Sequence, residues 1–457
     1  MKVLKFGGTS VGTVESLGNV KKIVEGIPGK AIIVVSALGG LTDVLINTAK
    51  NASKGEDSWK EAMTAIRERH HNIVKAMVPD NLKEEVTAKL NSLLDELERN
   101  YAGVFLLRAL PEKVLDVIVS FGERMSSIIV AAMVKNGKRY YSPDFIKTEK
   151  WYGKNIADTK LTHELICNTF AEMGEDEKAI VPGFISSDTS TLEITNLGRG
   201  GSDYTGALIA ASLDAEVLEI WTDVDGFMTA DPRIVKDAII IDHLTFTESM
   251  ELCTFGAKVI YPPTIYPVFH KNIPIKILNT FNPAAPGTLI TDQASENDLE
   301  VKGVTALKGV SLISVAINSG KKESEELLRR AYKILSKQAV KIIPVANPDP
   351  TAELNFAVTS SDAKVVLDMF QKEFQPEIRS GKLGEPALKE NLSAIALVGK
   401  EMRSKSRLAA RIGHSLRRQG INVNAHSAGN SDTTMIYIID QEKSPVALPL
   451  IHSLIYR

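Results

Sequence analysis

The stretch Lys5-Phe6-Gly7-Gly8-Thr9-Ser10-Val11 decides the fold together with Gly198-Arg199-Gly200-Gly201-Ser202-Asp203. An apolar strand precedes the first stretch, and residues 192–197 read as a strand before the second. Glycines and then hydroxyl residues follow, which predicts helices from Ser10 and Ser202. A glycine turn at a helix N-terminus presents free N–H groups and the positive end of the helix dipole, an arrangement that binds phosphate. Two such loops predict two anionic groups held face to face, as in phosphoryl transfer, although two ordinary α/β turns are the alternative.

The composition is that of an ordinary soluble protein. The chain has 457 residues, of which 44% are hydrophobic and 24% are charged, and its net charge is −2. This length predicts two to four domains. The sequence has no long run of one charge sign, so we expect no nucleic-acid partner. It has no apolar run of about 20 residues, so we expect no membrane partner. Cys167 and Cys253 lack metal-ligand spacing, and the N-terminus lacks a signal-peptide pattern, so we expect a cytoplasmic enzyme.

A second strand leads to two candidate ligand contacts. The apolar run Ala31-Ile32-Ile33-Val34-Val35 is typical of a parallel strand buried on both faces. Ser36 follows it directly, and the turn before Thr42 opens the next helix. In open parallel sheets, ligands lie beyond the C-terminal ends of the strands, where both hydroxyls fall. Either hydroxyl could instead cap a helix.

The next segments are helical. Residues 58–110 predict an amphipathic helical insertion, in which we expect His70-His71 to lie on a solvated face because no third metal ligand is near. Within the following apolar helix, Glu123 and Arg124 are adjacent and therefore point in different directions. A carboxylate in such a run is either solvated at a helix end or reserved for the ammonium group of a ligand.

A later strand ends in polar residues that suit a nucleotide. The run 216–221 is followed by Thr222 and Asp223, and then by Asp231-Pro232-Arg233. Asp223 with Asp225 resembles the start of a calcium loop, but the rest of that pattern is absent. We therefore interpret this acidic turn and its Arg as contacts for a base and phosphates.

These motifs resemble, in order, those of the aspartate kinases in the amino-acid kinase superfamily. The matching motifs are the two opening stretches, Phe121-Gly122-Glu123-Arg124, Trp221-Thr222-Asp223-Val224, Asp231-Pro232-Arg233 and Phe255-Gly256-Ala257-Lys258. The resemblance implies an αβα sandwich with a mainly parallel sheet over residues 1–292. It further implies transfer of the γ-phosphoryl group of ATP, with Mg²⁺, to the β-carboxylate of L-aspartate. That reaction is the first step toward lysine, threonine and methionine.

The resemblance also implies a role for each residue of the site. The implied catalytic residues are Lys5, Gly7, Gly8 and Asp203. Lys5 and the two glycine N–H groups would neutralise the moving phosphoryl group, and Asp203 would orient Lys5. The implied aspartate contacts are Glu123 for the ammonium group, Arg199 for the α-carboxylate, and Ser36, Thr42, Gly200, Gly201 and Ser202. The implied ATP contacts are Lys5, Gly8, Thr222, Asp223, Met228, Arg233 and Lys258.

Two positions depart from the family pattern. Met228 stands where a tyrosine near the adenine is common, and Tyr261-Pro262-Pro263 replaces a common His-Pro-Arg. A thioether in place of an aromatic ring changes the contact with the base. Neither departure touches the implied catalytic groups.

The C-terminal part resembles a tandem pair of ferredoxin-like ACT domains, at 301–390 and 391–457. Each has the order strand, helix, strand, strand, helix, and the second lacks its last strand. We expect residues 301–307 to supply that strand. The family implies regulation by lysine or threonine and a homodimer or higher oligomer through these domains, although a pair used only for dimerisation is the alternative. The weak effector candidates are Asn318, Ser319, Ser427 and Asn430.

Other functions remain as competing hypotheses. The same fold could phosphorylate another acid, such as glutamate or acetylglutamate, or could bind an amino acid without turnover. The length leads us to expect no homoserine dehydrogenase domain after the regulatory pair.

Overall fold

The computed structural model describes residues 1–151, 154–295, 299–337, 342–345, 353–427 and 432–456, and the chain forms two compact units. Unit 1 comprises Met1–Phe227, Asp242–Phe246 and Val259–Ala294. Unit 2 comprises Met228–Ile241, Thr247–Lys258 and Ser295–Arg457.

The division differs from the single boundary near residue 292 that the sequence predicted. Two segments that precede residue 292, Met228–Ile241 and Thr247–Lys258, cluster with the C-terminal part. The Val304 N–H donates to the Thr229 carbonyl at 2.8 Å, and Ala230 belongs to the same apolar core as Val304. These two segments therefore belong to unit 2 because they pack against its strands, although they precede residue 292 in the sequence.

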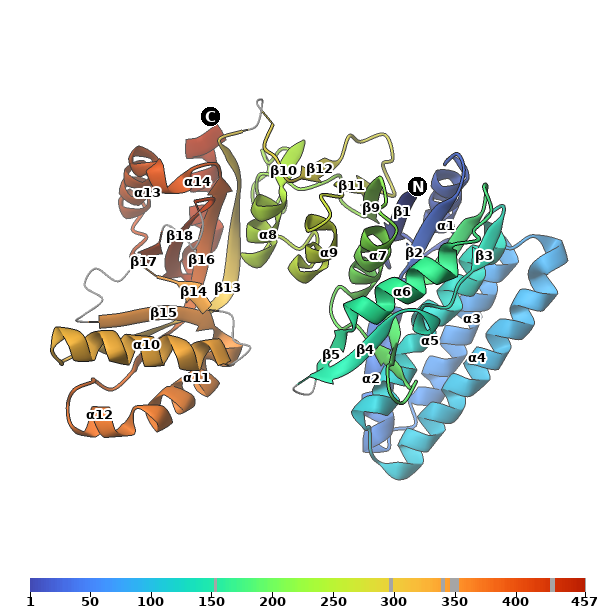
Figure 1. Ribbon diagram of the computed structural model, residues 1–457, viewed down its shortest axis with the longest axis horizontal. Helices are drawn as coiled ribbons and strands as arrows, with labels where there is room; N and C mark the ends of the chain where they lie inside the picture. Colours follow the sequence, from blue (N-terminus) through green and yellow to red (C-terminus); the bar gives the residue numbers. More distant parts are fainter. Residues whose placement is uncertain (152–153, 296–298, 338–341, 346–352, 428–431, 457) are drawn as a thin grey trace. The chain divides into compact units, whose positions relative to one another are not determined.

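An eight-stranded sheet forms the centre of unit 1, with the order β10-β12-β11-β9-β1-β2-β6-β3 (Figure 1). Neighbouring strands are parallel except β11 and β12, which confirms the mainly parallel sheet. Its strands are β1 (Lys2–Phe6), β2 (Ala31–Val35), β3 (Gly137–Arg139), β6 (Lys178–Pro182), β9 (Val217–Thr222), β10 (His243–Thr245), β11 (Ile275–Asn279) and β12 (Thr288–Thr291). All five residues of β2 are fully buried, as expected for a strand covered on both faces.

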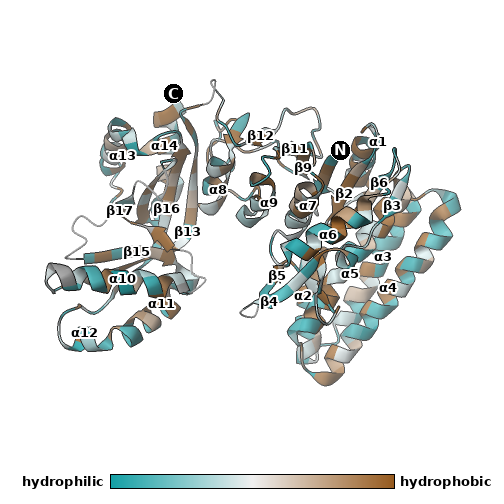
Figure 2. Ribbon diagram, viewed as in Figure 1, coloured by the Kyte–Doolittle hydropathy of each residue, from teal (hydrophilic) through white to brown (hydrophobic). Residues whose placement is uncertain are grey.

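Helices cover this sheet and complete the αβα sandwich. They are α1 (Val14–Glu25), α2 (Leu41–Lys54), α3 (Trp59–Met77), α4 (Asp80–Leu107), α5 (Glu112–Met133), α6 (Thr159–Phe170), α7 (Gly201–Ser212) and α9 (Tyr266–Phe269). The helices α1 to α5 share one apolar core with Leu4, Phe6, Ile33 and Val35 of the sheet, whereas α7 packs on β1, β2 and β9 with α6 and α9 beside it. Figure 2 shows the apolar centre of unit 1 and the mixed polar character of α3 and α4.

The helical insertion predicted at 58–110 forms α3 and α4, which lie side by side (Figure 1). The expectation of a solvated His70-His71 pair is wrong for His70. His70 is buried, its Nδ1 lies 2.7 Å from the Ile66 carbonyl, and burial lowers its pKa to about 4. A histidine in such a place is neutral and belongs to the core.

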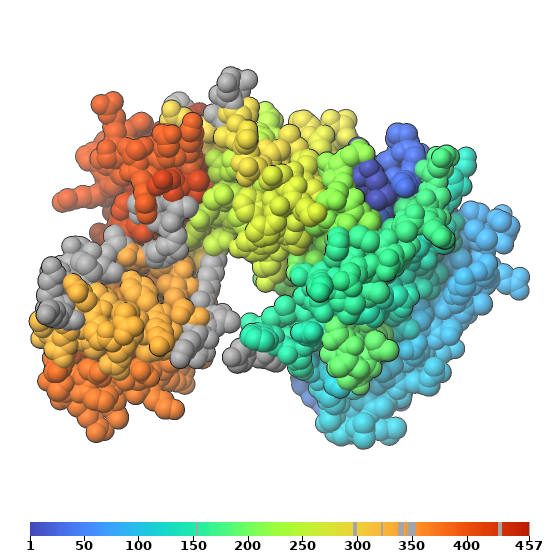
Figure 3. Space-filling model, viewed as in Figure 1, coloured from blue at the N-terminus to red at the C-terminus, as the bar shows by residue number. Residues whose placement is uncertain are grey.

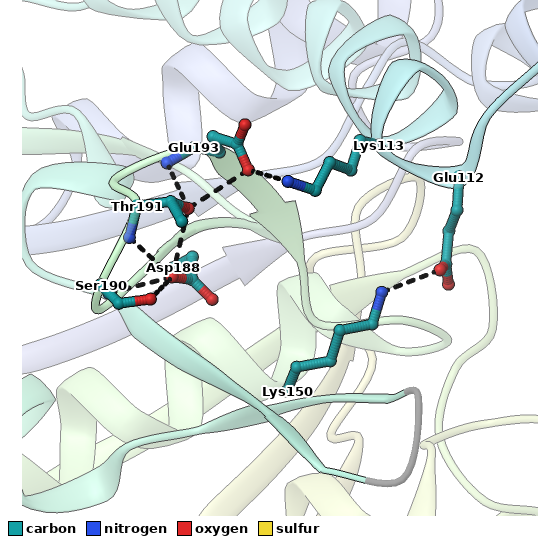
Figure 4. Close-up of polar contacts among 7 residues, drawn as sticks. All are labelled: Glu112, Lys113, Lys150, Asp188, Ser190, Thr191 and Glu193. Carbon is teal, nitrogen blue, oxygen red and sulfur yellow. Dashed lines mark hydrogen bonds and ion pairs between the residues drawn. The ribbon is translucent and has the colours of Figure 1, made fainter.

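A four-stranded sheet, β5-β4-β7-β8, leads into the second glycine loop. Its strands are β4 (Lys147–Trp151), β5 (Lys154–Ala157), β7 (Ile185–Asp188) and β8 (Ile194–Asn196). Two ion pairs join it to the start of α5: Lys113 with Glu193 and, at 3.0 Å, Lys150 with Glu112 (Figure 4). Asp188 accepts hydrogen bonds from Ser190 and Thr191, which order the turn between β7 and β8 and lower the pKa of Asp188 to about 2.

Unit 2 contains a six-stranded sheet with the order β14-β15-β13-β16-β18-β17. Its elements are β13 (Val301–Ala316), α10 (Lys321–Lys337), β14 (Ile342–Pro344), β15 (Glu353–Thr359), α11 (Ser360–Glu373), α12 (Gln375–Arg379), β16 (Ala387–Gly399), α13 (Ser406–Arg418), β17 (Val423–Ser427), β18 (Thr434–Asp440) and α14 (Ser444–Tyr456), preceded by α8 (Phe246–Thr254), which begins in unit 1.

One long strand serves both halves of this sheet. The first part of β13 pairs with β16, from Val301 opposite Gly399 to Lys308 opposite Ser393. The part after Gly309 pairs with β15, from Val310 opposite Thr359 onward. Gly309 has φ +70° at the register shift between these parts, where a residue with a Cβ would be strained. The two βαββα repeats are therefore interleaved through β13.

None of the helices in the described part of the chain combines the length and the apolar character that a bilayer crossing requires.

Candidate active site

A cavity of about 270 Å³ in unit 1 gathers the residues that the sequence predicted to bind aspartate. The residues that line it are Lys5, Ser36, Thr42, Glu123, Phe184, Gly198, Arg199, Gly200, Gly201, Ser202 and Asp203. They come from the C-terminal ends of β1 and β2, the first turn of α2, the middle of α5, the segment after β6, and the glycine loop that follows β8 and leads into the first turn of α7. A larger cavity of about 920 Å³ shares Gly198 and Arg199 with it.

The predicted partners Lys5 and Asp203 meet in this cavity. The Lys5 Nζ lies 2.6 Å from the Asp203 Oδ1, and the two side chains are only 11% and 12% exposed. Lys5 comes from β1, and Asp203 from the first turn of α7, where the helix dipole favours a carboxylate. Asp203 thereby holds the ammonium group of Lys5 in place at the edge of the sheet.

The first glycine loop differs from its prediction in two respects. Helix α1 begins at Val14, capped by Thr13, and not at Ser10. Ser10 is buried and its Oγ lies 2.7 Å from the Thr280 Oγ1, so its hydroxyl serves packing between loops. The Gly7 N–H, which the sequence predicted to face the phosphoryl group, donates to the Trp221 carbonyl at 3.0 Å, and its contact with that group stays a prediction. The contact predicted for the Gly8 N–H stays a prediction.

The second glycine loop has the backbone that its glycines permit. Gly198 and Gly200 have φ of +71° and +70°, and α7 begins at Gly201, one residue before the predicted start. A Cβ on Gly200 would lie 2.4 Å from the Cβ of Tyr261. Only glycine satisfies both the conformation and the space at this position.

We expect Gly200→Ala to lower the free energy of unfolding by about 1–3 kcal/mol, because it combines left-handed strain with a clash against Tyr261. Denaturant unfolding measures the change. Gly103→Ala is the matched control, since Gly103 lies within α4 with nothing within 4 Å of the added Cβ, and it should be neutral or stabilising. Equal stability of Gly200→Ala and the unmodified protein would contradict the prediction.

Glu123 is a buried carboxylate directed at the cavity. Its Oε1 accepts the Ala37 N–H at 3.1 Å, and its Oε2 is buried with no hydrogen-bond partner among the described residues. Burial raises the pKa of Glu123 to about 8. A buried acceptor without a partner is costly, so the site is suited to a ligand that donates hydrogen bonds. Nearby, the Ser126 hydroxyl donates to the Ser36 carbonyl at 2.7 Å and holds α5 against the end of β2.

The sequence interpretation missed residues that shape the site. Phe184 lines the cavity with φ +68° and follows strand β6 at the same edge of the sheet, which is the signal that could have found it. Asn196 joins two walls of the site, because its Nδ2 donates to Asp116 of α5 and its Oδ1 accepts the Gly198 N–H at 3.1 Å. No local pattern identifies such a bridge.

The predicted nucleotide contacts fall in both units. Thr222 ends β9 beside β1, and its hydroxyl donates to the Asp223 carboxylate at 3.2 Å. Met228, Arg233 and Lys258 belong to unit 2, where Arg233 is 80% exposed and forms a two-bond pair with Asp231 at 2.9 and 2.7 Å. That all of them bind one nucleotide stays a prediction.

The predicted effector residues lie in loops of unit 2. The Asn318 amide donates to the Gly381 carbonyl at 3.2 Å. The Ser319 hydroxyl is buried with no hydrogen-bond partner in the described part of the chain. Ser427 ends β17 and is buried, whereas Asn430 lies outside the described residues. The described residues contain no group of three or more His, Cys, Asp or Glu placed to hold a metal ion.

Comparisons with known proteins point to one family. The sequence model of the amino acid kinase family matches residues 1–279, and that of an ACT domain matches residues 395–454. A bifunctional aspartokinase/homoserine dehydrogenase of Buchnera aphidicola is 31% identical over 471 residues, covering 100% of this chain and 56% of the relative. The chain thus spans little more than half of that relative's length.

Solved structures resemble the whole chain. E. coli aspartokinase III in complex with aspartate and ADP matches with a TM-score of 0.82, at 25% identity, over 100% of both chains. The same enzyme in complex with lysine and aspartate matches with a TM-score of 0.72, at 24% identity, again over 100% of both chains.

Proposed function

Because the chain belongs to the amino acid kinase family, we propose that it is an aspartate kinase. It transfers the γ-phosphoryl group of ATP to the β-carboxylate of L-aspartate and forms 4-phospho-L-aspartate. The cavity carries this proposal, since it combines a buried carboxylate, an exposed guanidinium and a Lys–Asp pair around a space that suits an amino acid. The related E. coli enzyme with aspartate and ADP supports the same substrates.

In the proposed mechanism, the protein positions two anions and neutralises charge. Glu123 receives the α-ammonium group, and Arg199 holds the α-carboxylate through two parallel hydrogen bonds. Lys5, oriented by Asp203, stabilises the charge on the phosphoryl group during transfer. The acceptor is already a carboxylate, so no general base is required.

ATP brings Mg²⁺ to the site in this proposal. Mg²⁺ prefers oxygen ligands and is commonly held by phosphate oxygens together with one or two carboxylates. Asp223 is an exposed carboxylate at the end of β9 and fits such a role. The ion would neutralise phosphate charge, while Lys5 acts from the protein.

Regulation by an amino acid is proposed for unit 2. The buried Ser319 hydroxyl without a partner in the described chain suits a ligand contact there. Lysine is the first effector to test because the related E. coli enzyme is known with lysine, and threonine is the second. We further propose a homodimer or higher oligomer through the ACT domains, and a cytoplasmic location in keeping with the two free cysteines.

The deciding experiment measures ATP consumption with Mg²⁺ and L-aspartate and traps the product as the hydroxamate. Turnover that requires aspartate supports the proposal, and inhibition by lysine or threonine assigns the effector. Activity on glutamate or acetylglutamate, but not on aspartate, would show that the enzyme phosphorylates a different acid. Aspartate binding without turnover would make the protein a sensor.

We expect Arg199→Lys to raise the KM for aspartate roughly 30- to 100-fold with a smaller change in kcat. A lysine keeps the charge but loses the two-bond geometry with a carboxylate. Steady-state kinetics at saturating ATP measures both constants. Lys154→Arg is the control, because Lys154 is an exposed cation elsewhere in the larger cavity. An unchanged KM in Arg199→Lys would show that Arg199 does not bind aspartate.

A further inference from the structure

A groove of about 750 Å³ lies between α4 and α5, outside the cavity that holds Glu123. Its apolar lining is formed by Leu82, Val86, Leu93, Ile128, Ala131 and Ala132. Its cations are Lys89, Arg124, Lys138 and Arg139, and its one carboxylate is Glu85. Figure 3 shows α4 in light blue on the outer surface of unit 1. The groove therefore combines an apolar floor with an excess of positive charge.

Three of the four cations have carboxylate partners. Lys89 pairs with Glu85 on the same helix. Arg124 pairs with Glu96 at 3.0 Å and stacks on the Phe121 ring, and Lys138 lies 3.8 Å from Glu177. Arg139 differs, because no ion pair of the described residues includes it, and its Nε donates only to the Ser127 hydroxyl at 2.9 Å.

The Arg139 guanidinium is nevertheless partly buried. It lies over the Tyr141 ring, 5.1 Å from the ring centre. Burial lowers the pKa of Arg139, and the positive charge of Arg124 acts in the same direction, whereas Tyr141 and the Asp144 carboxylate oppose this shift without forming an ion pair with Arg139. A desolvated guanidinium beside a second one is unfavourable unless an anion compensates the charge. Its terminal N–H groups have the fork geometry that carboxylates and phosphates accept.

We propose that this groove binds a small organic anion, with a carboxylate or phosphate between Arg139 and Arg124 and an apolar body along α4 and α5. Tyr141 also lines the groove, and a phenolic hydroxyl can donate a hydrogen bond to the same anionic head. The apolar floor distinguishes this ligand from a free inorganic anion. The proposal is independent of the kinase activity, because none of the residues that line the cavity around Lys5 and Asp203 lines the groove.

Hexyl phosphate is the probe, with inorganic phosphate and hexanol as its two separate halves, and isothermal titration calorimetry on the full chain measures binding. We expect hexyl phosphate to bind at least about tenfold more tightly than either half. We expect Arg139→Gln to weaken it about tenfold or more, because a charge-assisted pair is lost. Ser92→Glu, at an exposed position of α4 in the groove, adds a negative charge and should weaken it without disturbing the fold.

Lys135→Gln is the matched control, since Lys135 is an exposed cation on the neighbouring turn outside the groove, and we expect it to leave binding within about twofold. Equal weakening by Arg139→Gln and Lys135→Gln would reduce the effect to general surface attraction and overturn the proposal. Inorganic phosphate that binds as tightly as hexyl phosphate would also overturn it, since no apolar subsite would then exist. Thermal unfolding of each variant shows whether it is folded, and the separate kinase assay keeps the outcome distinct from that of the proposed function.

Discussion

Replacing Lys5 with methionine is expected to lower kcat about a thousandfold, which is the scale of losing one strong electrostatic stabiliser of a transition state. The Lys5 Nζ is held 2.6 Å from the Asp203 carboxylate at the edge of the sheet, so its charge is fixed before substrates bind. Methionine keeps a linear stem of similar length but carries no charge. Single-turnover and steady-state kinetics measure the loss.

The change also leaves Asp203 buried without its partner, and this effect on stability must be separated from catalysis. The double variant Lys5→Met with Asp203→Asn removes both charges and should recover stability without recovering kcat. Lys2→Met is the matched control, because Lys2 lies on the same strand, pairs with Glu219 at 2.9 Å and is 43% exposed. Its kcat should stay within about twofold of the unmodified value. A near-normal kcat in Lys5→Met would exclude Lys5 from the catalytic step.

The second large effect is a pH dependence of aspartate binding set by Glu123. Burial raises the pKa of Glu123 from its usual 4.5 to about 8, so the carboxyl is protonated in the free protein at neutral pH. Because the α-ammonium group of aspartate favours the ionised form, binding below pH 8 releases one proton. The KM for aspartate should therefore fall up to tenfold per pH unit between about pH 6 and 8, and level off above.

Glu123→Gln should abolish this dependence and raise the KM at pH 8.5 about 10- to 100-fold, because a charged partner of the ammonium group is lost. Without ligand, the free energy of unfolding should fall as pH rises from 4.5 through about 8, since only the unfolded state releases the Glu123 proton over that range. Glu96→Gln, a carboxylate on α4 outside the cavity, is the control and should keep the pH dependence. A KM that does not vary with pH in the unmodified protein would contradict the role of Glu123.

The sequence was sufficient for features that depend on local pattern. The apolar run at 31–35 predicted a strand buried on both faces, and the glycines at 198 and 200 predicted a turn before a helix; β2 and α7 confirm both predictions. Residues at the C-terminal ends of parallel strands share one edge of the sheet, so Lys5 at the end of β1 and Ser36 after β2 could be placed together in advance. Arg199 and Asp203 instead follow β8, which belongs to the smaller sheet.

Tertiary packing decided which backbone groups are hydrogen-bonded and which segments belong to each unit, neither of which the local sequence pattern shows. The Gly7 N–H looked free in sequence, but β9 lies parallel beside β1 and its Trp221 carbonyl takes that hydrogen bond. Residues 228–241 joined unit 2 because they pack with the strand at 301–316, far along the chain.

By itself, then, the sequence determined which residues form the strands and the glycine turns, because periodicity and backbone conformation are properties of neighbouring residues. The resemblance of its motifs to those of the aspartate kinases indicated the residues of the candidate cavity. Only the tertiary structure decided which N–H groups remain available, where the units divide, and that Glu123 is a buried acid with a raised pKa. The physical reason is that hydrogen-bond partners and desolvation come from segments distant in sequence, which no local pattern contains.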